Sequence, residues 1–292
     1  MEQIIDTPSK PISRRRRMAT IIRSAPFTAK LGMVVVAIYA LVAIFAPWVA
    51  PYGEAEVASR VPFDTWSWEH WLGTDRLGRD FLSRLIYGAR NSISIALVTT
   101  LFSCTIGCLT GVFSALIGGT VDQMISRFVD AIMSVPDLIF ILMILSIFGS
   151  SIPNLILIIA LLTSTRFFRI SRAAALNVGN LDFVEAAQVR GEGLLWISVN
   201  EIFPNILPLI LSELGMHFCF IFLSIAALSF LGVGIKPPAA EWGSMVRENA
   251  ALINTGDITP LIPAAAIAFL IISVNFVVDW QLNRASGLSD EG

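Results

Sequence analysis

The sequence predicts an all-α integral membrane protein with six transmembrane helices. Of its 292 residues 55% are hydrophobic and only 14% are charged, whereas soluble domains are about one quarter charged. Six apolar stretches are long enough to cross about 30 Å of hydrocarbon as helices. All three cysteines, Cys104, Cys108 and Cys219, lie in apolar runs. They indicate packing residues, with no disulfide framework and no metal site.

Residues 1–30 form a basic segment, and residues 31–50 form the first uncharged span. The basic side chains suit nucleic acid or anionic lipid. Because a span follows at once, we expect them instead to hold the N-terminus in the cytoplasm, with no role in binding nucleic acid. No cleavable signal peptide is evident, since the apolar run has the length of a span and no small-residue cleavage site stands out.

Residues 51–92 are predicted to be an extracytoplasmic loop followed by an amphipathic segment. Three glycines permit tight turns and the charges alternate in sign. From Asp80 onward an apolar helical stripe suits a helix lying flat on the membrane. A brace of turns and ion pairs is favoured over substrate contact, and hydrogen bonding or packing is favoured over metal ligation for the histidine. The residues of this motif are His70, Gly73, Asp75, Gly78, Arg79, Asp80, Arg84, Gly88 and Arg90.

Residues 93–283 are predicted to form a core of five spans joined by one long loop, 174–205. The expected spans are 93–117, 122–148, 152–170, 206–233 and 259–278. Gly107 and Gly111 make a small-residue face for helix packing. Pro136 should kink the third span, where Arg127 and Asp130 are spaced to pair.

Three polar residues inside the spans are candidate pathway residues. Asp137 is expected about 20 Å along the third span, where an acid faces a wet cavity or pairs with the helices of a partner. Glu213 and His217 are four residues apart and share a helix face. Two ligands are too few for a selective nickel site, so we expect a hydrogen bond between helices or a polar patch.

The long loop contains an amphipathic, partly charged helix. Asp182 is expected to cap it, with Glu185 completing a capping-box-like start. Ala186 and Ala187 are small enough for another surface to approach closely. Gly191 is expected to end the helix, and Pro204 with Pro208 should mark the start of the next span. A surface helix packed on lipid headgroups is the alternative.

Three separated motifs resemble one family. The Glu185-Ala186-Ala187 triplet, Gly191 and the pair Pro204-Asn205 resemble the cytoplasmic EAA loop of permease subunits of ABC importers. Residues 70–92 resemble the C-type permeases of dipeptide, oligopeptide and nickel importers, and residues 228–246 resemble the peptide-type permeases. The resemblance covers roughly residues 30–280. Glu201 departs from it, because many peptide-type members carry a histidine there, and the Val-Val-Asp-Trp run that ends at Trp280 is a second departure.

The resemblance implies the type I ABC importer permease fold, with the helix at Glu185 as a coupling helix that seats in a groove of an ATPase subunit. It also implies a heterodimer with a homologous second permease, two ATPase subunits that bind ATP and Mg, and an extracytoplasmic substrate-binding protein. Alternating access would move di- or oligopeptides across the bacterial inner membrane. A metal chelate, nickel or an opine-like solute is the alternative cargo.

The sequence itself offers little for catalysis. It has no Gly-x-x-x-x-Gly-Lys-Ser/Thr loop, so nucleotide chemistry must come from partners, and no cofactor is expected in this chain. An intramembrane enzyme is a distant alternative, since only two histidines and no Gly-x-Ser-x-Gly elbow occur. A channel is a third possibility, but a channel would need no coupling loop, so the EAA-like loop argues against it. With both termini, including the tail 284–292, in the cytoplasm, 13 of 20 Lys and Arg residues lie inside, which favours this orientation.

Overall fold

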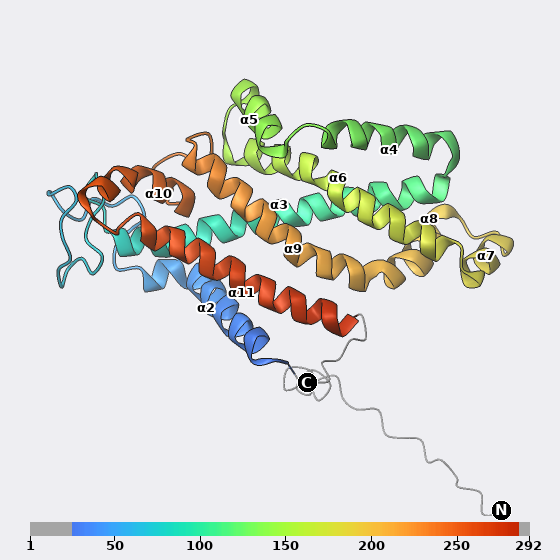
Figure 1. Ribbon diagram of the computed structural model, residues 1–292, viewed down its shortest axis with the longest axis horizontal. Coiled ribbons are helices and arrows are strands. Elements are labelled where there is room, and N and C mark those ends of the chain that lie inside the picture. Colours follow the sequence, from blue (N-terminus) through green and yellow to red (C-terminus); the bar gives the residue numbers. More distant parts are fainter. Residues whose placement is uncertain (1–24, 286–292) are drawn as a thin grey trace, which may run out of the picture.

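A computed structural model describes residues 25–285, and their long helices lie roughly along one axis (Figure 1). In these residues no strand forms, and only two isolated bridges occur, Val57 with Arg79 and Thr74 with Asp80. The prediction of an all-α membrane protein is confirmed. In chain order the helices are α2 (Phe27–Val49), α3 (Phe81–Ile117), α4 (Gly119–Met133), α5 (Asp137–Phe148), α6 (Ile152–Gly179), α7 (Asp182–Val189), α8 (Leu194–Ile197), η1 (Ser198–Ile202), α9 (Phe203–Phe230), α10 (Trp242–Asn249), η2 (Ala250–Thr255) and α11 (Leu261–Ala285).

Within residues 25–285, five helices are long and apolar enough to cross a membrane: α2, α3, α6, the continuous run from α8 through α9, and α11. A sixth span exists if the bent pair α4 and α5 counts as one. The helices extend beyond several predicted limits. The first begins at Phe27, not at residue 31, α6 continues to Gly179 and so occupies the start of the predicted loop 174–205, and α11 runs to Ala285, into the predicted tail. Residues 1–24 and 286–292, which hold most of the basic segment and of the tail, lie outside the described residues.

The prediction of a surface helix before the second span is wrong, because the amphipathic segment is not a separate helix. Residues 81–92 are the first three turns of α3, which continues unbroken to Ile117 over 37 residues, or about 56 Å. Asp80 starts the helix by accepting a hydrogen bond from the Ser83 amide. Phe81 and Arg84 are fully buried, and Gly88 lies against the Trp242 ring. These turns are therefore buried by packing against α10.

The third predicted span is broken. Helices α4 and α5 meet at an angle of 88°, with Pro136 immediately before α5. A proline cannot donate the backbone hydrogen bond of a helix interior and disfavours helical geometry in the residue before it. Asp137 is consequently the first residue of α5, and its expected depth in a continuous helix is wrong.

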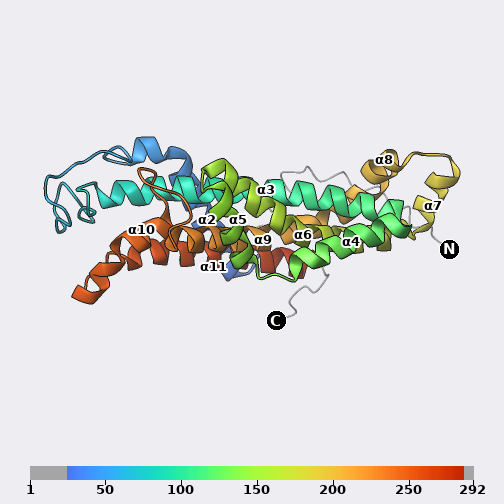
Figure 2. The same cartoon turned by 90° about the horizontal axis from the view of Figure 1, so that it is seen from above.

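Helices α3 and α6 run side by side in the same direction and form the central seam (Figures 1 and 2). A Cβ atom at Gly107 would lie 2.3 Å from the Ser164 carbonyl oxygen, and one at Gly111 would lie 2.2 Å from the Ser171 hydroxyl. The predicted small-residue packing face is confirmed. It lets the two backbones approach closely enough for Ser103 to hydrogen-bond Thr163 at 2.9 Å.

Two apolar clusters lie along this seam. One is centred on Phe222, Trp242 and the first half of α3. The other joins the second half of α3 to α6, α7 and the start of α9. Helix α7 lies at one end of the long axis, and the loop 51–80 lies with α10 at the other end (Figures 1 and 2).

Candidate functional site

Helix α7 projects at one end of the molecule and is held there by one face. Val184 and Ala187 are fully buried and pack with Ile197 and Ile202 of the following segment. The predicted cap is wrong: Leu181, which has no polar side chain, occupies the N-cap, and Asp182 is already the first helical residue. Asp182 and Glu185 lie instead in the first turn, where acids favour the positive end of the helix dipole.

The other face of α7 is open. Glu185 and Ala186 are exposed, and so are apolar side chains of this end, including Val189 at 83% and Leu195 at 69% exposure. Exposed apolar patches on a protein commonly mark interaction sites. Ala187 does not belong to this face, so the expectation that both alanines admit a second surface is wrong for Ala187: its methyl group fills the chain's own core.

Gly191 ends the helix as predicted. Its φ of +81° is a left-handed conformation that favours glycine, and its amide donates to the Gln188 carbonyl oxygen at 2.9 Å. A Cβ there would meet no atom within 4 Å, so the turn faces open space. Arg190 lies 4.0 Å from Glu201, the residue that departs from the family pattern.

The pair Pro204-Asn205 lies at the start of α9, not in α7. Pro204 occupies the first turn, where a missing amide proton costs nothing. The Asn205 side chain donates to the Glu201 carbonyl oxygen at 2.6 Å. Pro208, predicted to mark the same boundary, is inside α9.

An unpredicted row of ion pairs fixes the bent segment α4 and α5 to α6. Asp137 pairs with Arg166, and Asp130 pairs with Arg169 at 2.7 Å. Asp122 at the start of α4 accepts two hydrogen bonds from Arg172. The arginines recur every three residues and therefore lie along one side of α6. The predicted pairing of Arg127 with Asp130 is wrong, since Asp130 pairs with Arg169 instead.

The other two candidate pathway residues come together within α9. The His217 imidazole lies 2.9 Å from the Glu213 carbonyl oxygen and 3.5 Å from its carboxylate. The expected hydrogen bond between helices is replaced by this contact within α9, and the imidazole packs 4.3 Å from the Phe167 ring of α6. Arg166, beside Phe167, lies over the Phe220 ring at 3.8 Å. Arg166 contacts Asp137, and the adjacent Phe167 contacts His217, so one turn of α6 lies between Asp137 and the pair Glu213 and His217.

At the opposite end, the motif before the second span forms a buried polar network. Arg79 donates to Asp75 at 2.7 Å, and Arg84 lies 3.3 Å from the same carboxylate. Both arginines also reach Glu248 of α10. His70 hydrogen-bonds Asp80 at 3.0 Å. Paired burial of this kind offsets the cost of removing the charges from water.

The glycines and the last arginine of this motif have clear places too. Gly73 and Gly78 both have φ of +73°, and a Cβ at either would collide with a backbone carbonyl oxygen of the preceding loop. Arg90 is exposed on α3.

Sequence reasoning missed α10, which ties the network to the rest of the fold. Glu241 begins α10 by accepting hydrogen bonds from the amides of Gly243 and Ser244. Its complete burial raises the pKa of the carboxyl above the usual range, partly offset by these donors. The Trp242 indole donates to the Leu85 carbonyl oxygen at 2.9 Å. Glutamate is not among the residues that usually cap a helix, so the sequence held no local signal for this cap.

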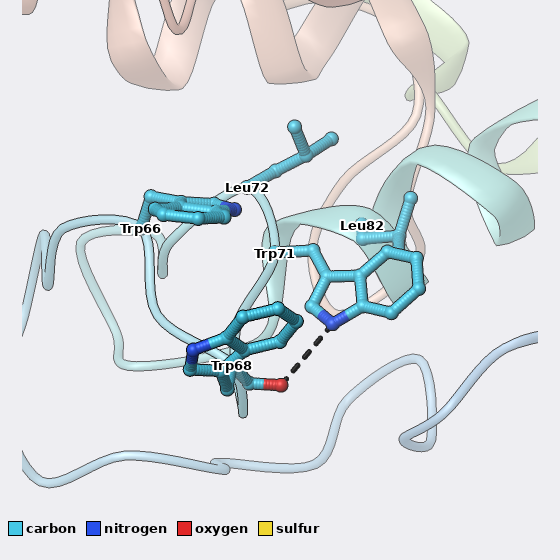
Figure 3. Close-up of a pocket in the computed structure, with 5 residues that line it drawn as sticks. All are labelled: Trp66, Trp68, Trp71, Leu72 and Leu82. Carbon is cyan, nitrogen blue, oxygen red and sulfur yellow. Dashed lines mark hydrogen bonds between the residues drawn. The ribbon is translucent and has the colours of Figure 1, made fainter.

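The same end carries an aromatic hollow of about 380 Å³ (Figure 3). Trp66, Trp68 and Trp71 line it together with Leu72 and Leu82, and the Trp71 indole donates to the Trp68 carbonyl oxygen at 3.1 Å. All three rings are at least 60% exposed. Among residues 25–285, no three His, Cys, Asp or Glu side chains gather closely enough to hold a metal ion.

Comparison with known proteins agrees with this architecture. Residues 104–284 match the family described as "Binding-protein-dependent transport system inner membrane component". Residues 28–62 match the "N-terminal TM domain of oligopeptide transport permease C". In a solved structure of the MetNI methionine ABC transporter in inward-facing conformations, one chain shares the fold with a TM-score of 0.57 at 18% identity, over 69% of this chain and 95% of that one.

Curated relatives are similar over most of their length. The dipeptide transport system permease protein DppC of Haemophilus influenzae is 34% identical over 86% of this chain and 87% of its own. DppC of Escherichia coli K12 is 35% identical over 86% of each chain. The nickel transport system permease protein NikC of Escherichia coli K12 is 30% identical over 88% of this chain and 92% of its own.

These matches explain the multi-pass helical fold and place the protein among transport permeases of the bacterial inner membrane, not among enzymes. Permeases of this family work with ATPase subunits and a substrate-binding protein. The chain therefore belongs to the binding-protein-dependent inner membrane transport components, as a C-type permease subunit of the ABC importers that include the dipeptide and nickel systems.

Proposed function

We propose that this permease forms one half of a translocation pathway for di- or oligopeptides and that the exposed face of α7 couples it to ATP hydrolysis. The observation that carries the proposal is the contrast within α7: Val184 and Ala187 anchor the helix, while Glu185 and Ala186 face outward. A helix held on one side can transmit force from a socket that grips the other side. The coupling surface comprises Glu185, Ala186 and Gly191, with Ala187 buried behind it, and the exposed Pro204 and Asn205 at the start of α9 complete the proposed site.

The remaining half of the pathway would come from a homologous second permease, and ATP and Mg would bind to two ATPase subunits. Closure of the ATPases would draw the coupling helices together and open the pathway to the outside. Asp137, Glu213 and His217 are the proposed polar pathway residues, since the acids among them retain partial exposure in otherwise apolar helices. Both termini would lie in the cytoplasm, with α7 at the cytoplasmic end.

The proposed cargo follows from the relatives. The dipeptide permeases are 34–35% identical to this chain and the nickel permease is 30% identical. Nickel, a metal chelate or an opine-like solute is therefore the second candidate. In both cases the binding protein would select the solute before it reaches the permease.

Reconstitution of the full complex in proteoliposomes tests the proposal. We expect uptake of radiolabelled dialanine that requires ATP and the binding protein, with no uptake of ⁶³Ni²⁺. Nickel uptake without dialanine uptake would move the function to the second candidate. Solute flux that needs neither ATP nor the binding protein would contradict an importer and indicate a channel.

A further inference from the structure

A polar hollow at the end opposite α7 has no part in the coupling or pathway residues described above. Its volume is about 280 Å³. It lies between the turn after Asp75, the connection from α9 to α10, and α10 itself. Its lining residues are Arg76, Gly232, Ile235, Lys236, Pro237, Ser244, Arg247 and Glu248.

Three cationic side chains line this hollow without a partner. Arg76, Lys236 and Arg247 are exposed, and within residues 25–285 their side chains make no ion pair or hydrogen bond. The one carboxylate in the lining, Glu248, is occupied by the buried guanidinium groups of Arg79 at 3.4 Å and Arg84 at 3.3 Å. The hollow therefore presents three positive charges that no side chain of residues 25–285 neutralises.

The position of Arg247 depends on a special backbone feature. Gly232, in the reversal after α9, has a φ of +88°, and a Cβ built there would lie 2.7 Å from the guanidinium carbon of Arg247. The guanidinium thus rests on the bare backbone of a glycine. A side chain at position 232 would displace it, so the local chain geometry places this charge at the hollow.

A carboxylate is the ligand that fits such a lining. Guanidinium groups bind carboxylates through two parallel hydrogen bonds, and an ammonium group adds a point charge. Ile235 and Pro237 supply apolar walls suited to the short stem of an aspartate or glutamate side chain.

The carboxylate can belong to a free solute or to a protein surface, and exposure decides between them. Sites for small solutes enclose most of the ligand surface, whereas all three cations here are open to solvent. Exposed ion pairs alone contribute little binding free energy. They become effective when a protein lobe covers them and excludes water, and they also raise the association rate of an oppositely charged partner.

We propose that Arg76, Lys236 and Arg247 form a docking site for acidic side chains on a lobe of the extracytoplasmic binding protein. The inference rests on the proposed function, because that function places this end of the chain outside the membrane. The aromatic hollow at Trp66, Trp68 and Trp71 belongs to the loop 51–80 at the same end of the molecule and offers apolar area to the same partner (Figure 1).

The test uses the whole reconstituted complex and the binding protein that supports its uptake. The charge-reversed permease Arg76→Glu, Lys236→Glu, Arg247→Glu should bind the binding protein about tenfold more weakly or worse, and the salt dependence of docking should flatten. The affinity of the free binding protein for its solute should not change. Arg60→Glu is the matched control, since Arg60 is also an exposed cation of this end that lies outside the hollow.

A second arm establishes the chemistry of the partner. Replacing acids on the docking lobe of the binding protein with lysine should restore docking to the charge-reversed permease and impair docking to the unmodified one. Unchanged docking by the charge-reversed permease would overturn the proposal. A second result would also overturn it: docking stays unchanged, uptake of dialanine falls, and uptake of the dialanine amide does not. The hollow would then bind the carboxylate of the solute. Absence of binding-protein-dependent uptake in the unmodified complex would instead contradict the proposed function.

Discussion

The charged motif that joins α3 to α10 at one end of this permease is buried and paired, whereas the charges on α7 at the other end are exposed. At the end that carries α10, Asp75, Arg79 and Arg84 are at most 3% exposed and are joined to Glu248. At the α7 end, Glu185 is exposed, and the Arg190 side chain is 55% exposed with its acids at 3.9 to 4.0 Å. One end is fixed by its own interactions, whereas the other holds α7 by two buried side chains and leaves its outer face uncovered.

This difference suits the two tasks proposed for the molecule. A buried ion-pair network is intolerant of change, because loss of one partner strands a charge away from water. It gives the long α3 a firm attachment to α10. A substitution on an exposed helix face removes few contacts within the chain and changes mainly the binding of a partner. Substitutions at the two ends should therefore separate into effects on stability and effects on coupling.

The largest expected effect is that of Arg84→Met. This change leaves the Asp75 and Glu248 carboxylates without one of their two buried cations and should cost about 3–5 kcal/mol of stability. A thermal unfolding curve of the purified complex in detergent measures it. Arg60→Met, at an exposed site of the same end, is the control and should stay within about 0.5 kcal/mol. Equal midpoints for the two variants would show that the network does not stabilise this end.

Gly107→Ala should come next, because the seam of α3 and α6 joins the two ends. The added Cβ would lie 2.3 Å from the Ser164 carbonyl oxygen, so the helices must separate, at about 1–3 kcal/mol. Gly179→Ala, also helical but with no atom within 4 Å of the new methyl group, provides the comparison. The same unfolding assay should rank Gly107→Ala clearly below Gly179→Ala; the reverse order would contradict close packing at the seam.

A smaller effect is expected from the row of ion pairs on α6. Asp137→Asn removes the charge that faces Arg166 where both side chains are about 30% exposed, so the stability cost should be at most about 1 kcal/mol. If Asp137 acts in the pathway, uptake should fall while the complex still assembles. The exchange Asp137→Arg with Arg166→Asp restores the pair and separates the two roles. Recovery of uptake in the exchanged variant would assign Asp137 to structure.

The spans and the position of α7 could be predicted because hydropathy and a helix-ending glycine are local signals. Gly191 marks the end of α7 in the sequence as clearly as in the structure. The 88° break at Pro136 could not be predicted, since a proline indicates a kink but not its angle. Its size depends on the pairing of α4 and α5 with α6.

The burial and the partners of individual side chains could not be predicted from the sequence for a similar reason. Ala186 and Ala187 are adjacent and identical in type, yet one faces solvent and the other is fully buried, because α7 is anchored on the face that carries Val184. The partners of Asp122 and Asp137 lie 50 and 29 residues away. Only the packed helices bring such residues together.

These two alanines give the most direct test of the claim that the open face of α7 couples transport to ATP hydrolysis. Ala187→Trp should destabilise the permease itself by overpacking its core. Ala186→Trp should leave the unfolding midpoint unchanged yet reduce dialanine uptake per ATP hydrolysed about tenfold or more, measured together in the same proteoliposomes. Substrate-stimulated hydrolysis and uptake that both remain normal in Ala186→Trp would contradict the account and favour a helix that merely rests on lipid headgroups.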